Sequence, residues 1–215
     1  MSLQQKFLDM MHKIPELYKG VKSYTGDVTL GGSVLARYPA DGVLYRATVV
    51  SVQPFSKFIV QYVDFGNKQL VDAKDIWQLD RQLMDLPKMA IHCSLIGVAP
   101  VDGEWKANPE VDLCFNAPRY QCVFQDCVDG QYQVSLWNNG ASVVDMLVEK
   151  QLATLSEQQA SVTLKDEAID LTIIVGQQIT CRVTHVESYE KFYVQLDLEK
   201  ADLVENAIAN IDINL

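Results

Sequence analysis

The residues that could do covalent chemistry in this chain are its cysteines and histidines. The cysteines are Cys93, Cys114, Cys122, Cys127 and Cys181, an odd set without the Cys-x-x-Cys spacing or histidine pair of a zinc site. The one adjacent pair, His92-Cys93, is a poor catalytic dyad, because neighbouring residues on a strand point to opposite faces. Thiols in apolar, strand-like sequence behave as small hydrophobes. We therefore expect no metal, no cofactor and no disulfide framework, and a reducing, cytoplasmic compartment.

Predicted helices and strands must position any other site. An amphipathic pattern from Leu3 to Leu17 predicts an N-terminal helix, and four strand-like runs follow at 33–38, 44–52, 58–64 and 68–71. Only short turns separate these runs, and this arrangement is typical of a small, strongly bent antiparallel barrel. A helical pattern over 75–86 then ends at Pro87.

A second β-rich unit is predicted beyond this connector. It contains a strand at 91–98 and a hairpin of 120–125 with 132–137. Residues 142–152 then form either a helix or a final strand followed by a helix. An acidic, Gln-rich stretch leads to two more strands, at 178–186 and 191–196, and to a helical pattern over 201–211.

An internal repeat relates two of the predicted hairpins. A displacement of 134 residues superposes one set of residues on another: Val49, Val52, Phe55, Lys57, Phe58, Val60 and Gln61 on Val183, Val186, Tyr189, Lys191, Phe192, Val194 and Gln195. The second copy continues Leu196-Asp197-Leu198 where the first has Tyr62-Val-Asp-Phe-Gly-Asn67. The second copy therefore cannot bind what the first binds through its tip.

The composition is that of a globular protein with a sizeable core, since 48% of residues are hydrophobic and 21% are charged. The formal net charge is -10. Because phosphate neutralisation by Lys and Arg supplies most nucleic-acid affinity, this charge argues against non-specific nucleic-acid binding and favours a cationic partner. The acidic excess is concentrated after residue 156, where a solubilising surface is the more ordinary explanation.

Three sequence runs resemble a Tudor domain: Gly32-Ser-Val-Leu-Ala-Arg-Tyr38, Asp41-Gly-Val-Leu-Tyr45-Arg-Ala47 and Val60-Gln-Tyr-Val-Asp-Phe-Gly-Asn67. The flanking sequence is similar to that of the extended Tudor module. The residues that carry this similarity are Met84-Asp-Leu-Pro87, Cys93-Ser-Leu95, Gly97, Pro100 and Trp105. In that module the small barrel is joined by a helix to an OB-type barrel folded like staphylococcal nuclease. The resemblance implies a fold that is mainly β with a few helices.

The resemblance also implies a layout for the chain. Residues 1–25 would be the N-terminal helix and linker of the nuclease-like lobe, 26–79 the Tudor barrel, 80–90 a connector helix, 91–155 the nuclease-like lobe and 156–175 an acidic linker. A lobe built from 91–155 alone would have open strand edges. We therefore expect the hairpin and helix of 176–215 to complete it, within one chain or by strand exchange with a neighbouring copy.

Recognition of methylated arginine is the function that the resemblance implies. In extended Tudor modules that bind symmetrically dimethylated arginine, four aromatic residues and an asparagine form the pocket. The matching residues here are Tyr38, Tyr45, Tyr62, Phe65 and Asn67. Electron-rich ring faces attract a delocalised cation, and an asparagine amide can hydrogen-bond a guanidinium N–H.

Barrel core is the competing interpretation of these residues. Tyr45 and Tyr62 lie on predicted strands, where an aromatic side chain commonly packs inside. Phe65 and Asn67 favour a binding site, because a turn places its side chains at the rim of a barrel.

Two other classes of function compete with peptide recognition. An active nuclease needs clustered carboxylates and several arginines, yet Arg119 is the only arginine within 91–155 and the carboxylates are scattered. An OB-type single-stranded RNA-binding module would use stacking aromatic residues, here Trp105, Phe115, Phe124 and Trp137, against an unfavourable charge. A Tudor scaffold that binds unmethylated peptide is a further alternative.

We predict a non-catalytic reader. By resemblance, its partner would be the symmetrically dimethylated, Arg-rich tail of a Piwi-clade Argonaute, and the protein would be a scaffold in piRNA-mediated transposon silencing. The setting would be cytoplasmic, in perinuclear germ granules (nuage), without membrane association or direct nucleic-acid binding.

Overall fold

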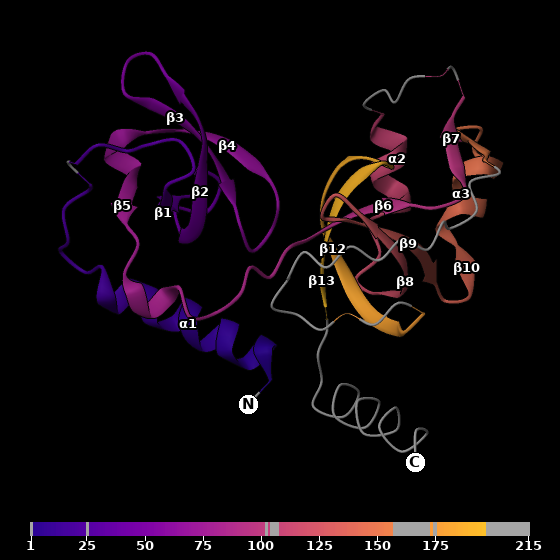
Figure 1. Ribbon diagram of the computed structural model, residues 1–215, viewed down its shortest axis with the longest axis horizontal. Helices are drawn as coiled ribbons and strands as arrows, with labels where there is room; N and C mark the ends of the chain where they lie inside the picture. The colour runs from indigo at the N-terminus through magenta and orange to yellow at the C-terminus, as the bar shows by residue number, and fades with distance from the viewer. Residues whose placement is uncertain are drawn as a thin grey trace. The chain divides into compact units, whose positions relative to one another are not determined.

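The computed structural model describes residues 2–24, 26–101, 103, 108–156, 173 and 176–196. Two compact units are present. The first contains Met1–Val60 and Gln69–Leu86, and the second contains Gln61–Lys68 and Pro87–Leu196. Each is built mainly from antiparallel strands (Figure 1), so the predicted fold class, mainly β with a few helices, is confirmed.

A helix opens the first unit. α1 spans Leu3–Leu17, and its buried residues follow the predicted apolar stripe. The resemblance assigns residues 1–25 to the nuclease-like lobe, but the helix is part of the first unit. At the end of the helix, the hydroxyl of Tyr18 donates to the carbonyl of Gln78 (2.7 Å) and accepts the N–H of Asp80 (2.9 Å), which ties the helix to residues of the same unit.

The strands of the first unit form one sheet in the order β4-β3-β2-β1-β5. They are β1 Ser33–Arg37, β2 Leu44–Gln53, β3 Lys57–Tyr62, β4 Lys68–Asp72 and β5 Ile76–Gln78. A 3-10 turn, Ala73–Asp75, joins the last two. In the antiparallel register Leu35 pairs with Arg46 of β2 and with Trp77 of β5, so β1 is a central strand. Its residues Val34, Leu35 and Ala36 are accordingly buried in the core.

The predicted connector helix over 80–90 is not formed as such. Within that range only Arg81–Leu83 is helical, as a single 3-10 turn, and the preceding Ile76–Gln78 is a strand rather than helix. The guanidinium of Arg46 donates to the carbonyls of Leu83 (2.9 Å) and Leu86, so these carbonyls are held by a side chain of β2. Pro87 also lacks the N–H that a helix would need.

The second unit contains a closed barrel. Its strands are β6 Ile91–Leu95, β7 Val98–Pro100, β8 Tyr120–Val128, β9 Gln131–Asn138, β10 Ala141–Ser142, β11 Ala153–Leu155, β12 Gln178–Ser188 and β13 Lys191–Leu196, with helices α2 Pro109–Cys114 and α3 Val143–Glu149. The sheet order is β10-β9-β6-β13-β12-β8, and β8 also pairs with β9, which closes the ring. β6 and β9 are parallel, and the other pairs of the ring are antiparallel.

The hairpin β12–β13 fills the gap between β6 and β8. Tyr193 of β13 pairs with His92 of β6, and Ile179 of β12 pairs with Cys122 of β8. Phe192, Val194 and Cys181 of the hairpin are fully buried in the barrel core. Without the hairpin, two strands would present unpaired backbone groups.

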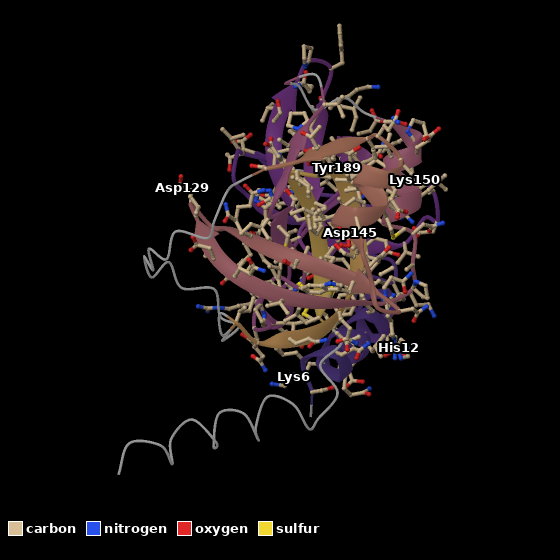
Figure 2. The ribbon with its side chains drawn as sticks, turned by 90° about the vertical axis from the view of Figure 1, so that its right-hand side faces the viewer. Lys6, His12, Asp129, Asp145, Lys150 and Tyr189 are labelled. Carbon is tan, nitrogen blue, oxygen red and sulfur yellow. The ribbon has the colours of Figure 1, made fainter. Side chains whose placement is uncertain are left out.

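Two details of this unit depart from or extend the sequence pattern. The predicted strand 91–98 is two strands, since Gly97 has φ +81 between β6 and β7, and β7 pairs with β11 instead. In the turn of the predicted hairpin, Asp129 and Gly130 both have positive φ, and Asp129 lies at the outer end of the β8–β9 hairpin (Figure 2).

Some expectations fall outside the described residues. They are the helix over 201–211 and nearly all of the acidic linker 156–175. Among the residues that the structure does describe, no helix is long and apolar enough to cross a membrane.

Candidate functional site

The turn between β1 and β2 fixes the backbone around Tyr38 and Tyr45. The N–H of Tyr38 donates to the carbonyl of Val43, and the N–H of Gly42 donates back to the carbonyl of Tyr38, both at 2.8 Å. Gly42 has φ +72, a left-handed conformation that glycine adopts without steric cost. Immediately beyond the turn, Ala36 pairs with Tyr45.

Tyr38 and Tyr45 form a ring pair in the first unit. Both are half-buried, and their rings meet edge to face with centroids 6.3 Å apart and planes at 74°. The hydroxyl of Tyr45 donates a 2.7 Å hydrogen bond to Oδ2 of Asp41. Burial and this neighbouring carboxylate raise the pKa of Tyr45 to about 12, so the ring stays neutral at physiological pH.

Arg37 holds the same turn from β1. Its Nη1 donates to the carbonyl of Gly42 (2.8 Å), and its Nε lies 3.4 Å from Oδ1 of Asp75. The guanidinium also lies over the Trp77 ring, 5.0 Å from the centroid. The turn that carries Asp41 is therefore braced against the segment leading into β5.

The end of β3 and the turn after it contain the other three candidate residues, in the second unit. The carbonyl of Tyr62 accepts the N–H of Phe65 (3.2 Å) and of Gly66 (2.7 Å), and the N–H of Tyr62 donates to the carbonyl of Asn67 (3.0 Å). Phe65 and Asn67 are half-buried, whereas Tyr62 is only 1% exposed. The structure thus groups Tyr62, Phe65 and Asn67 in one turn, and the burial of Tyr62 fits the core interpretation for that residue.

Comparison with known proteins identifies a domain within the chain. Residues 1–97 match the family model of the Tudor domain. This part of the chain is therefore a Tudor domain. The matched range includes α1, all of β1 to β5 and β6.

Curated Tudor proteins from several animals are similar to this chain. Protein tudor of Drosophila melanogaster is 28% identical over 211 residues, which cover 91% of this chain and 8% of that protein. Tudor domain-containing protein 1 is 30% identical over 128 residues in Mus musculus (56% of this chain, 10% of that protein) and 34% identical over 143 residues in Danio rerio (64% and 12%). The chain therefore spans 8 to 12% of the length of these relatives.

Solved extended Tudor domains share the fold. Domain TD3 of mouse TDRD1, in complex with a MILI peptide containing dimethylarginine, has a TM-score of 0.66 and 21% identity, covering 71% of this chain and 81% of that one. Human TDRD1, in complex with a symmetrically dimethylated peptide, has a TM-score of 0.64 and 22% identity, covering 71% and 79%. The complex of Tudor with Aubergine dimethylated at an arginine has a TM-score of 0.53 and 20% identity, covering 66% and 84%.

Two of the four aromatic residues considered for RNA stacking lie in the protein core. Phe115 and Phe124 are core residues, 4% and 0% exposed. Their rings pack on Phe192 and on Tyr132 respectively. Trp137 is half-buried, and Trp105 lies outside the described residues.

The Cys/His candidates occupy the second barrel. Cys93 is fully buried, and burial raises the pKa of its thiol well above the usual value, so the thiol stays protonated. The neighbouring His92 stacks on Tyr193 across the strand pair. Within the described ranges, no group of three or more His, Cys, Asp or Glu side chains could hold a metal ion.

Sequence reasoning missed the residues that brace the Tudor turns. Asp41 and Arg37 have no role in the aromatic pattern, yet they fix the turn that carries Tyr38 and Tyr45. The Asp-Gly pair at 41–42 predicts only a turn, because its spacing from Tyr45 in the sequence does not indicate that the tyrosine hydroxyl contacts Asp41.

Proposed function

We propose that this extended Tudor module is a non-catalytic reader of symmetrically dimethylated arginine, bound by Tyr38, Tyr45, Tyr62, Phe65 and Asn67. The observation that carries the proposal is the Tyr38–Tyr45 ring pair, half-buried and held at 74° by a turn whose carboxylate orients the Tyr45 hydroxyl. Tudor domains as a family are binding modules, which supports a function without catalysis.

The chemistry of the ligand matches such rings. A well-placed aromatic face attracts a delocalised cation by about 0.5 to 2 kcal/mol, depending on desolvation. Methylation leaves the guanidinium charge in place and makes its surface more apolar, so it leaves water more easily. The carboxylate of Asp41 adds negative potential beside Tyr45, which favours a cation over a neutral side chain.

Asn67 would fix the orientation of the bound guanidinium group. Its amide oxygen can accept one guanidinium N–H and hold the plane of the group parallel to the rings. Symmetric dimethylation leaves an N–H on each terminal nitrogen, whereas asymmetric dimethylation removes both from one nitrogen. The symmetric form can therefore donate to the asparagine from either terminal nitrogen, whereas the asymmetric form can donate only from its unmethylated terminal nitrogen.

The partner we propose is the Arg-rich tail of a Piwi-clade Argonaute, within a scaffold for piRNA-mediated transposon silencing in cytoplasmic germ granules. The extended Tudor structures named above include complexes with a MILI peptide and with Aubergine, and the curated relatives include Protein tudor. The net charge of -10 favours an arginine-rich partner by long-range attraction.

Binding titrations with one peptide in four states test the proposal. The unmodified, monomethyl, asymmetric and symmetric dimethyl forms of an Arg-rich tail should bind this chain with increasing affinity toward the symmetric form. Equal affinity for all four would overturn the methylarginine assignment and favour the unmethylated-peptide alternative. Filter binding of single-stranded RNA at low salt distinguishes the OB-type alternative, which predicts retention that the reader hypothesis does not.

A further inference from the structure

Three consecutive carbonyls of the Tyr62–Asn67 turn are each held by a side chain. The carbonyl of Asp64 accepts from Nε2 of Gln195, that of Phe65 from Oγ1 of Thr184 (2.8 Å), and that of Gly66 from Nε2 of Gln61 (2.9 Å). Thr184 and Gln195 belong to the hairpin β12–β13. The main chain of the turn is therefore positioned by the second barrel, and all of these residues lie in the second unit.

Tyr193 of β13 packs against the backbone of the same turn. Gly66 has φ +92, and a Cβ added to it would lie 2.1 Å from Cγ of Tyr193, so the ring packs directly on the glycine backbone. The Tyr193 hydroxyl accepts a 2.8 Å hydrogen bond from Nε2 of Gln61, the same nitrogen that holds Gly66. His92 stacks on the Tyr193 ring, with centroids 5.1 Å apart and planes at 19°. The ring is thus held in place by its own neighbours.

The internal repeat accounts for this arrangement. Gln61 and Gln195 are equivalent positions in the two copies of the repeated hairpin, and each donates to a carbonyl of the one turn. The preceding Val60 and Val194 are also equivalent, and both are fully buried. The second copy, whose sequence lacks the aromatic tip, supports the tip of the first.

We infer that the hairpin β12–β13 is part of the recognition machinery: Tyr193 and Thr184 are positioning residues that set where Phe65 and Asn67 stand, without touching the ligand. This inference rests on the proposed function. It gives the second barrel a role in recognition, since two of its ring strands supply side chains that order the turn. An ordered turn binds more tightly because less conformational entropy is lost on binding.

The test uses the whole chain and variants of the hairpin. Thr184→Val keeps the shape of the side chain and removes the hydroxyl that holds Phe65. Tyr193→Leu removes the ring against Gly66, and Tyr193→Phe restores the ring without the hydroxyl. Tyr120→Phe is the matched control, because the Tyr120 hydroxyl also bonds main-chain groups of the same unit (Ala117 N–H at 2.8 Å, Cys114 carbonyl at 3.0 Å).

The measured quantity is the ratio of affinities for the symmetric dimethyl and unmodified peptides. Thr184→Val should lower this ratio by about two- to tenfold, which is the range for the loss of one hydrogen bond. Tyr120→Phe should leave the ratio unchanged, although its melting temperature should be similar to that of Thr184→Val. Tyr193→Leu should lower it further, and Tyr193→Phe should recover most of it. If Tyr193→Leu does not fold, Thr184→Val decides.

Different results would contradict the proposed reader function and the positioning role of Tyr193 and Thr184. A wild-type chain that does not discriminate methylation contradicts the proposed function. A wild-type chain that discriminates, with Thr184→Val keeping the ratio of the Tyr120→Phe control, overturns the positioning role and leaves the reader function intact.

Discussion

The hydroxyl of Tyr45 donates to one oxygen of the Asp41 carboxylate, and the other oxygen accepts the N–H of Val43, at 2.7 and 2.8 Å. One carboxylate thus joins the conformation of the β1–β2 turn to the orientation of an aromatic ring. A change in the χ1 angle that swings the Tyr45 ring away would break a charge-assisted hydrogen bond, which is stronger than a neutral one. The ring is therefore set in place before any ligand arrives.

Substitution of Tyr45 tests this relationship. Tyr45→Ala removes a ring and opens the site to water, so affinity for the symmetric dimethyl peptide should fall by about tenfold or more. Tyr45→Phe keeps the ring and loses only the bond to Asp41, so its loss should be smaller, about two- to fivefold. Isothermal titration calorimetry measures both. Wild-type affinity for Tyr45→Ala would remove Tyr45 from the site.

Phe65 should contribute to binding without contributing to folding. Phe65→Ala should lose about tenfold or more in affinity for the same peptide. The fold should survive, because Phe65 is half-buried and its backbone is held by Thr184 through the carbonyl. Circular dichroism melts beside the titration separate the two effects.

Phe55 offers the matched control for that prediction. It lies in another turn, between β2 and β3, and is 93% exposed. Phe55→Ala removes the same ring from the surface, so binding should stay at the wild-type level. Equal losses for Phe55→Ala and Phe65→Ala would mean that the substitutions act through general destabilisation.

The strands were predictable because burial alternates along them. In β9, Tyr132, Val134 and Leu136 are buried while their neighbours are half-buried, and this period of two is visible in the sequence. The connector was not predictable by the same means. Ile76 and Leu83 fit a helical spacing, but the open edge of β1 pairs with the segment from Ile76 and makes it a strand.

The candidate site could be predicted in part. The aromatic residues and Asn67 lie in recognisable runs, but their supports lie far away in sequence, since Thr184 is separated from Phe65 by 119 positions and Tyr193 from Gln61 by 132. Such contacts depend on how the ring of β9, β6, β13, β12 and β8 closes. A local pattern carries no information about that closure.

Stability should fall as the pH falls from about 7.5 to 5.5. Burial lowers the pKa of His92 and of His185, and the positive charge of Lys191 acts in the same direction on both. Between the folded and unfolded pKa values the unfolded chain binds more protons, so the free energy of unfolding rises with pH there. The pH range over which stability changes begins near 6.5, the pKa of an unfolded histidine, and extends to lower pH.

Urea titrations at the two pH values measure this effect. The double variant His92→Gln, His185→Gln should flatten the dependence. Glu187 titrates in a separate, more acidic window: burial opposes the shift, but hydrogen bonds from Lys191 and Lys68 lower its pKa. A wild-type chain equally stable at both pH values contradicts the assignment.

Removal of residues 176–215 should disrupt the second barrel. The deletion takes away β12 and β13, leaves the facing edges of β6 and β8 unpaired, and empties the positions of Phe192 and Val194 in the core. Hydrogen exchange should show loss of protection in β6 and β8, and the chain should aggregate.

A pair of valines tests the same closure without truncation. Val194 of β13 is 0% exposed, whereas Val128 at the end of β8 is 49% exposed. Val194→Ala removes two buried methyl groups and should cost about 2 kcal/mol of the free energy of unfolding, while Val128→Ala should cost less than about 0.5 kcal/mol. Denaturant titration measures both. If the truncated chain melts cooperatively at the wild-type temperature and the two valine variants are equally stable, then β12 and β13 do not close the barrel in solution, and the positioning role of Tyr193 fails with that closure.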